Sequence, residues 1–303
     1  MLDHTAFLSS VPAHTRDAMT GRSNGPALGH LLGHLVLIGC LAVYVAYALP
    51  GWPLALPALG VALAFLFTLQ HECTHQTPFR IRWLNEVVGH ATGLILIQPF
   101  QWFRAFHMAH HRFTNDPARD PELATPKPDT LPEILWHLGC LGYWRAKLVT
   151  LVNNAFGPLD ANYIAPRQKR RIRLEARLMI LIYALAAVLF GTTLFWLWLL
   201  PLALGFPVLR LYLLAEHGLC PPVANMFENT RTTFTNRAVR WLSWNMPYHA
   251  EHHAWPAVPY HALPRLHQLS APHLKSTSEG YSAFAAEYVS STTNGRDGSK
   301  ISD

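Results

Sequence analysis

The chain has 303 residues, of which 50% are hydrophobic and only 14% are Asp, Glu, Lys or Arg. Soluble domains carry about 25% charged residues, so this composition argues against a soluble enzyme and favours a membrane protein. The formal net charge of +6 would suit nucleic acid, but no nucleic-acid-binding motif accompanies the basic residues, and we expect no nucleic-acid partner.

The N-terminal part of the chain predicts a membrane hairpin. Residues 1–27 are polar and lack the apolar core of a signal peptide, so we expect a cytoplasmic N-terminal segment. Residues 28–49 contain no Lys, Arg, Asp or Glu, and a Pro-Gly-Trp-Pro turn joins them to a second apolar stretch over 54–70. Each stretch can cross the ~30 Å hydrocarbon layer as a helix of about 20 residues.

The first histidine pair follows the second apolar stretch directly. His71 and His75 have the i, i+4 spacing that places two side chains on one face of a helix. With Glu72 they also satisfy HExxH, the motif of zinc proteases. The apolar stretch 87–100 is too short to span a bilayer easily, and we expect it to lie at the membrane interface.

A second box follows at His107, His110 and His111, where three imidazoles share one helical face. Packing three titratable rings together is unfavourable because each ring needs hydrogen-bond partners. A metal ion resolves this conflict by accepting a lone pair from each neutral ring. Beyond the box, a Pro- and Asp-rich loop over 115–129 and an amphipathic surface helix over 131–156 are expected.

The C-terminal half predicts a second hairpin and a third box. A basic stretch over 167–177 precedes two apolar segments, predicted to span the membrane over about 174–190 and 194–214. His217 lies at the end of the second of these segments, just as the first box lies at the end of the apolar stretch over 54–70. Three further histidines repeat the HxxHH spacing, and residues 276–303 are expected to be a flexible tail. The third box consists of His249, His252 and His253.

The basic residues indicate one topology. Both hairpin tips are free of Lys and Arg, and the 24 basic residues lie elsewhere or at helix ends. The positive-inside rule therefore places both termini and every box in the cytoplasm. The expected fold is an all-α integral membrane protein with four spans in two hairpins and a cytoplasmic helical cap holding a di-metal site, within a domain covering 28–275.

The ligand count implies two metal ions. The three boxes supply eight histidines, His217 is a plausible ninth, and one metal ion rarely takes more than six ligands. Imidazole suits iron, zinc, copper or nickel, so ligand type alone leaves the metal open. Nearby polar side chains are expected to hydrogen-bond the ligand rings and to balance the metal charge. These side chains are Glu72, Asp116, Asp120, Glu216, Asn245 and Glu251.

The order HxxxH, HxxHH, a lone histidine, then HxxHH resembles the membrane fatty acid desaturase superfamily. The resemblance is strongest at 244–256, 110–117 and 216–218, and it covers roughly residues 30–270. It implies that the nine matched histidines bind two iron ions and that O2 is a co-substrate. It also implies electrons from a separate ferredoxin, Rieske-type ferredoxin, rubredoxin or cytochrome b5, because the chain has no HPGG motif of a fused cytochrome b5 domain.

The resemblance implies desaturation or hydroxylation of an unactivated C–H bond in a fatty acyl lipid or related hydrocarbon. The boxes are also similar to those of the bacterial hydrocarbon-oxygenase branch, so a carotenoid or small-metabolite oxygenase is the alternative.

Two rivals from other classes are weaker. An HExxH zinc protease needs two histidines and one further ligand, which gives no reason for two HxxHH boxes. A histidine-rich metal transporter would place polar residues inside its spans, and the four predicted spans hold few.

Overall fold

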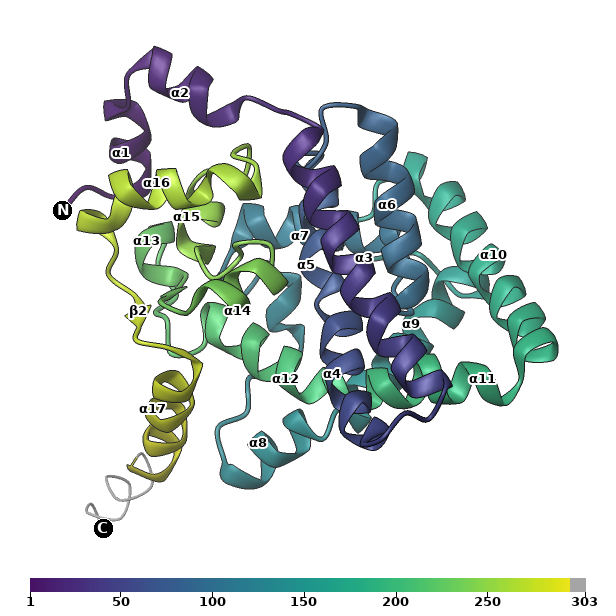
Figure 1. Cartoon of the computed structure of the whole chain (residues 1–303). Coiled ribbons are helices and arrows are strands. Elements are labelled where there is room, and N and C mark those ends of the chain that lie inside the picture. The colour runs from purple at the N-terminus through teal and green to yellow at the C-terminus, as the bar shows by residue number, and fades with distance from the viewer. Residues whose placement is uncertain (295–303) are drawn as a thin grey trace, which may run out of the picture. The chain divides into compact units, whose positions relative to one another are not determined.

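The computed structural model describes residues 1–294, and nearly all of its regular structure is helical (Figure 1). The chain forms two compact units, each described by itself. The terminal unit comprises Met1–Gly21, His110–Leu141 and the chain from Arg210 onward, and the middle unit comprises Arg22–Ala109 and Gly142–Leu209.

The middle unit contains most of the apolar sequence. Within it α3 packs against α4, and α5 packs against α6. Its elements are α3 (Gly25–Ala46), α4 (Trp52–Ala64), α5 (Leu66–His75), α6 (Arg82–Ile95), α7 (Phe100–Phe113, to Ala109), α9 (Leu141–Phe156, from Gly142), α10 (Pro166–Phe190), α11 (Thr192–Leu194), the π-helix η2 (Phe195–Leu199) and the first part of α12 (Leu200–His217).

Two glycines let helices α4 and α12 meet backbone to backbone. A Cβ atom at Gly60 would lie 1.8 Å from the Pro201 carbonyl oxygen, and one at Gly205 would lie 2.0 Å from the Gly60 carbonyl carbon. Small residues at such crossings are typical of membrane helices, where close packing replaces the hydrophobic driving force.

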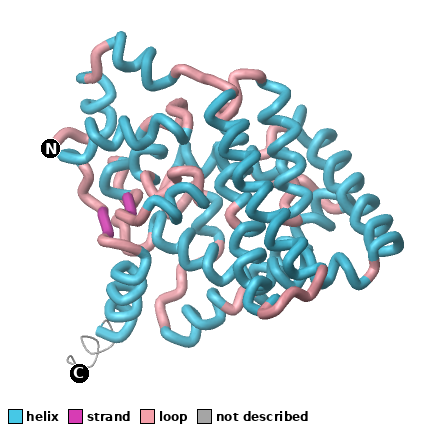
Figure 2. The backbone as a smooth tube through the Cα atoms, viewed as in Figure 1, coloured by secondary structure: helices cyan, strands magenta, loops and turns pink. Residues whose placement is uncertain are grey.

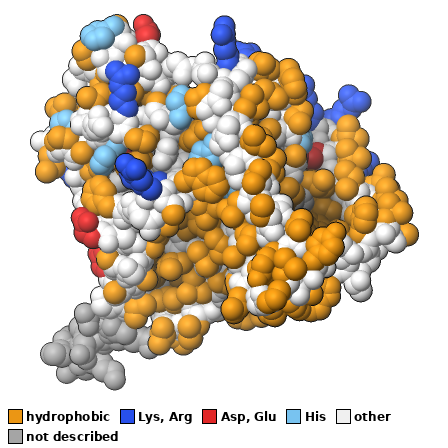
Figure 3. Space-filling view, viewed as in Figure 1, with side chains coloured by type: hydrophobic (Ala, Val, Ile, Leu, Met, Phe, Trp, Pro, Cys, Tyr) orange, Lys and Arg blue, Asp and Glu red, His pale blue; other side chains and the backbone are white. Residues whose placement is uncertain are grey.

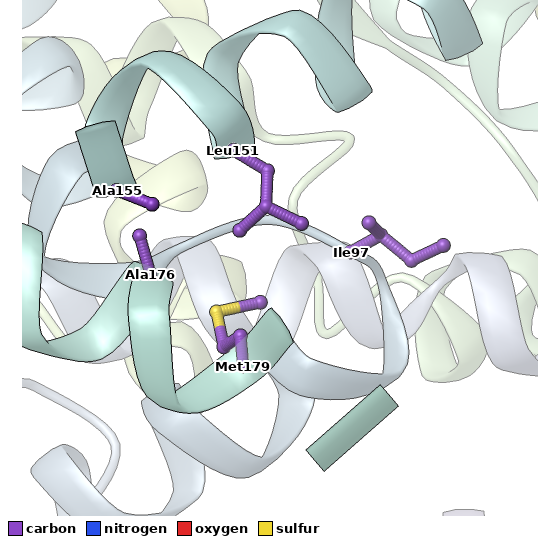
Figure 4. Packing of buried hydrophobic residues seen from close by; sticks show 5 residues of the cluster. All are labelled: Ile97, Leu151, Ala155, Ala176 and Met179. Carbon is purple, nitrogen blue, oxygen red and sulfur yellow. The ribbon is translucent and has the colours of Figure 1, made fainter. Parts of the chain in front are cut away.

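A buried cluster joins the helices of the same unit that lie further along the chain. Ile97 belongs to one cluster with side chains of α9 and α10 (Figure 4). The other members of the cluster are Leu151, Ala155, Ala176 and Met179.

The outer faces of the middle unit are apolar, as a lipid-facing surface requires. Leu32 on α3 is 64% exposed, and Val188 on α10 is 83% exposed. Figure 3 shows hydrophobic side chains gathered over the part of the visible face where α3 and α4 lie. Large exposed apolar areas of this kind mark membrane contact in a protein whose composition is poor in charge.

Three helical stretches of the described chain are long and apolar enough to cross a membrane: Ala13–Ala46, Trp52–His75 and Thr192–His217. The predicted fourth span lies within α10, which begins at Pro166 rather than near Leu174. The first half of α10 carries Arg173, Glu175 and Arg177, and these charges make it too polar to be a fourth candidate span. Membrane character is therefore supported, whereas four spans are not confirmed.

The terminal unit is built from short helices around a two-stranded parallel sheet, in which Thr232 is opposite Thr277 (Figure 2). Its elements are α1 (His4–Ser10), α2 (Ala13–Thr20), the end of α7, η1 (Pro121–Ala124), α8 (Leu131–Leu138), the end of α12, α13 (Met226–Asn229), β1 (Thr232–Thr233), α14 (Arg237–Leu242), α15 (His249–Ala254), η3 (Tyr260–Ala262), α16 (Leu263–Ser270), η4 (Ala271–His273), β2 (Thr277–Ser278) and α17 (Tyr281–Asn294).

The structure differs from the sequence prediction at two places outside the spans. The single helix expected over 131–156 is divided into α8 and α9, because Cys140 adopts a left-handed φ of 62° after Gly139. The tail expected to be flexible contains β2 and α17 up to Asn294, and Phe284 of α17 is fully buried. An apolar side chain every four residues, at Phe284 and Tyr288, gives α17 a face that packs on Leu214 and Ala215. Residues 295–303 lie outside the described part.

Candidate metal centre

Helix α7 carries the second histidine box across the boundary between the two units. His107 belongs to the middle unit, and His110 and His111 belong to the terminal unit. The nine histidines singled out in the sequence are thus divided between the units, three in the middle unit and six in the terminal unit.

In the terminal unit, His110, His217 and His253 form a buried cluster, called here the terminal triad. They come from the end of α7, the end of α12 and from α15, and their exposed fractions are 4%, 3% and 4%. One ring nitrogen of each lies within 4.8 Å of the others. Three distant parts of the sequence therefore bring imidazoles together within reach of one ion.

The outward-facing nitrogens of His110 and His217 have protein partners. Nδ1 of His110 lies 3.0 Å from an Asp120 carboxylate oxygen, and Nδ1 of His217 lies 3.3 Å from the Asn229 carbonyl oxygen. An acceptor at Nδ1 fixes the proton there and leaves the Nε2 lone pair available. The two Nε2 atoms face each other at 3.2 Å.

His253 completes this arrangement. Its Nδ1 lies 3.1 Å from the Thr114 hydroxyl oxygen, and its buried Nε2 has no hydrogen-bond partner within the described residues. A buried nitrogen in that situation costs free energy unless something else accepts its lone pair. A cation held by the three Nε2 atoms would satisfy all of them, so the terminal triad fits a metal ion.

The electrostatics of the terminal triad differ from ring to ring. Burial lowers the pKa of His110, but the nearby Glu122 and Asp120 carboxylates outweigh burial, and the net effect is a raised pKa. Burial and the neighbouring imidazoles hold the pKa of His253 well below its usual range. His253 is therefore neutral near pH 7 and can donate a lone pair.

The other three box histidines of the terminal unit lie beside the triad. Nε2 of His111 and Nε2 of His252 are 3.2 Å apart, and the His111 ring stacks on His253 with centroids 4.0 Å apart. The ring of His249 is centred 5.1 Å from that of His217, and its Nδ1 lies 3.4 Å from Glu216.

In the middle unit, His71, His75 and His107 form a second cluster, called here the middle triad. Nε2 of His75 lies 2.9 Å from Nε2 of His107, and the His71 and His107 ring centroids are 4.2 Å apart. One ring nitrogen of each histidine lies within 4.8 Å of the others, so this triad also fits a metal ion.

The end of α5 places His71 and His75. Gln76 adopts a left-handed φ of 57° and ends the helix directly after His75. The Thr77 hydroxyl then donates to the buried Glu72 carboxylate at 3.0 Å. Glu72 therefore fastens the turn that follows the first box.

The start of α7 is fastened by a residue that the sequence analysis did not single out. Glu175 accepts hydrogen bonds from the backbone N–H groups of Phe100 and Gln101, each at 2.8 Å, and lies 2.6 Å from Nδ1 of His90. A carboxylate at a helix N-terminus satisfies free N–H groups and interacts favourably with the helix dipole.

A second ion pair holds the same helix. Arg104 forms an ion pair with Glu86 at 2.7 Å, and although burial raises the pKa of Glu86, the hydrogen bond and charge of Arg104 outweigh burial and lower it. Arg104 also donates to the Cys73 carbonyl oxygen at 3.5 Å, which links α7 to the helix of the first box.

The polar residues predicted to contact the box histidines differ in the partners that they have in the structure. Glu216 lies beside His249, as noted above. Glu251 is fully buried, but its partners are Thr232 and His267, which lie outside the boxes. Asn245 donates to the Tyr260 carbonyl oxygen.

Of the two aspartates expected beside the second box, Asp120 and not Asp116 lies against a box histidine. Asp116 pairs with Arg119 at 2.6 Å, whereas Asp120 contacts His110. Thr114 and Asn229, which hold His253 and His217, carried no signal in the sequence because their contacts form only when distant segments meet.

Comparisons with known proteins agree with the histidine pattern. The model of the fatty acid desaturase family matches residues 49–285. An sn-1 oleoyl-lipid 12-desaturase of Picosynechococcus sp. is 28% identical over 264 residues, which cover 82% of this chain and 71% of that protein. The protein of the same name from Anabaena variabilis is 24% identical, over 75% of this chain and 59% of its own length.

The name of a third relative includes an electron-transfer protein, ferredoxin. The sn-1 acyl-lipid omega-3 desaturase (ferredoxin) of Nostoc sp. is 28% identical over 93 residues, 30% of this chain and 26% of that protein. The chain thus spans less than two thirds of the length of the Anabaena and Nostoc relatives.

Proposed function

The chain belongs to the fatty acid desaturase family, and on that premise we propose that it is a membrane-bound oxidoreductase that uses O2 and external electrons. Its reaction would desaturate or hydroxylate an unactivated C–H bond of a fatty acyl lipid or related hydrocarbon. The observation that carries the proposal is the terminal triad, in which protein groups engage each Nδ1 and the three Nε2 atoms gather.

We propose two iron ions as the cofactor, with one at the terminal triad and one at the middle triad. His111, His249 and His252 are proposed as further ligands from the terminal unit. Iron held in this way supplies the reduction of O2 and the removal of hydrogen from carbon. Two clusters of three histidines each favour this composition over a single zinc ion, which needs only four ligands.

The protein's own residues would provide positioning and exclusion of water. Asp120, Asn229 and Thr114 hold the rings of the terminal triad in one tautomer, which directs Nε2 inward. Lys127 donates to the His217 carbonyl oxygen at 2.7 Å and so fixes the end of α12. Burial of every ring in this triad keeps bulk water away from the reacting atoms.

The substrate and the electron donor are proposed from the chemistry of the chain and the names of its relatives. The exposed apolar helices would give an acyl chain access from the bilayer. A separate ferredoxin-type protein would deliver electrons, as the name of the Nostoc relative indicates for that protein. The positive-inside rule favours a cytoplasmic active site.

Product analysis tests the proposal directly. The full-length protein is expressed in a host lacking the activity, and membrane lipids are analysed by mass spectrometry for new double bonds or hydroxyl groups. His110→Ala should abolish the new product while the protein still inserts, because His110 belongs to the terminal triad. His14→Ala, at an exposed histidine, is the control and should leave the product unchanged. Retained turnover in His110→Ala would remove His110 from the ligand set.

A further inference from the structure

Helix α15 holds three of the proposed ligands but is too short to keep its position unaided. It has six residues, His249–Ala254, and an isolated helix of that length is not stable in water. The positions of His249, His252 and His253 therefore depend on contacts that other elements make with α15. Glu251, in the middle of the helix, is fully buried and makes two such contacts.

Each carboxylate oxygen of Glu251 accepts one hydrogen bond from a different element. Nδ1 of His267, on α16, donates to Oε1 at 2.5 Å, and the Thr232 hydroxyl, on β1, donates to Oε2 at 2.5 Å. A buried carboxylate is costly unless both oxygens are satisfied. These two bonds therefore tie the centre of α15 to α16 and β1.

The ring of His267 itself packs against two aromatic rings. Its centroid lies 4.8 Å from that of Tyr248 and 5.7 Å from that of Phe234, and its side chain is only 20% exposed. Tyr248 directly precedes the first ligand of α15, and its hydroxyl accepts from Arg240 at 2.5 Å. The donor that faces Glu251 is thus held in direction by contacts with other protein side chains.

We propose that His267 is a positioning residue for the third histidine box and acts through Glu251. Without the Nδ1 donor, one oxygen of a buried carboxylate loses its partner, and α15 must turn or shift to bring that oxygen to water. Metal ligands need placement within about 0.5 Å, so such a shift would weaken metal binding. The inference rests on the proposed function, because it takes the histidines of α15 to be iron ligands.

The test measures Fe²⁺ binding by the purified full-length protein in detergent. Binding is measured by Fe²⁺ titration, and the melting temperature is measured with and without Fe²⁺. His267→Phe keeps the ring and its stacking but removes the donor, and it should weaken Fe²⁺ binding about 10- to 100-fold. His267→Gln retains a donor and should bind within about threefold of the wild type. His273→Phe is the matched control, because His273 also packs against aromatic rings in this unit but contacts no carboxylate of the described residues.

The route through Glu251 is tested by a double-mutant cycle. Glu251→Gln and His267→Phe together should weaken Fe²⁺ binding no more than the stronger single variant, because both break the same connection. Additive losses would overturn the proposal, as would wild-type affinity in His267→Phe. If His267→Phe does not fold, wild-type affinity in both Thr232→Val and Glu251→Gln would overturn it instead. A wild-type protein that binds no Fe²⁺ would refute the proposed function rather than the role of His267.

Discussion

Removal of the Glu175 carboxylate should loosen the helix that carries the second histidine box. In Glu175→Ala, the backbone N–H groups of Phe100 and Gln101 each lose an acceptor at 2.8 Å, and His90 loses one at 2.6 Å. The side chain is only 8% exposed, so water replaces it poorly. Two charge-assisted hydrogen bonds at about 1.5 kcal/mol each suggest a loss of about 3 kcal/mol in the free energy of unfolding.

Thermal unfolding of the purified protein in detergent, followed by tryptophan fluorescence, measures this loss. About 3 kcal/mol corresponds to a decrease of roughly 5 °C in melting temperature for a chain of 303 residues. Glu287→Ala, at an exposed glutamate on α17, is the control and should change the melting temperature little. A Glu175→Ala protein that melts within about 1 °C of the wild type would refute the assignment of Glu175 as the cap of α7.

Three further outcomes are expected. Gly60→Ala should destabilise the protein by at least about 2 kcal/mol in thermal unfolding, because the new Cβ would lie 1.8 Å from a carbonyl oxygen, whereas Gly29→Ala meets no atom within 4 Å and should be tolerated. Replacing both carboxylates at Nδ1 of His110, Asp120 at 3.0 Å and Glu122 at 3.1 Å, in the double variant Asp120→Ala/Glu122→Ala should lower iron affinity about 10- to 100-fold in Fe²⁺ titration, and an unchanged affinity would contradict their role. Burial and the charge of Arg210 lower the pKa of His137 to about 4. Below pH 6.5 the unfolded state therefore binds a proton that the folded state does not, and the free energy of unfolding should fall by up to about 2 kcal/mol between pH 6.5 and 5. In His137→Gln this part of the stability–pH profile should be flatter.

The histidine boxes could be found in the sequence because their spacing is local. His107, His110 and His111 share a helical face whatever the rest of the chain does, and the structure places them on α7. The position of His217 at the end of an apolar helix was equally visible, and it lies in the terminal triad.

The supporting residues could not be found in this way. Glu175 lies 75 residues from Phe100, and His267 lies on α16, outside every histidine box. Their roles come from tertiary contacts, which the spacing of residues in a single sequence does not reveal. The aspartate that contacts His110 is set by the turn after α7, where Asn115 has a left-handed φ of 59°, and spacing alone favoured no choice between Asp116 and Asp120.

The lengths of the apolar helices were predicted better than their number. The stretches over 28–49 and 54–70 correspond to long apolar helices, and Pro57 does not interrupt α4. The basic residues before 174 were expected to lie outside the membrane, but α10 runs through them without a break from Pro166. Helix length and span length therefore differ there, because helix formation continues where hydrophobicity ends.

Metal analysis of the purified wild-type protein tests the central claim most directly. The terminal and middle triads, of three histidines each, predict about two iron ions per chain after anaerobic reconstitution with Fe²⁺, and His110→Ala and His107→Ala should each lower that value. One tightly bound zinc ion per chain, with no retained iron, would contradict it.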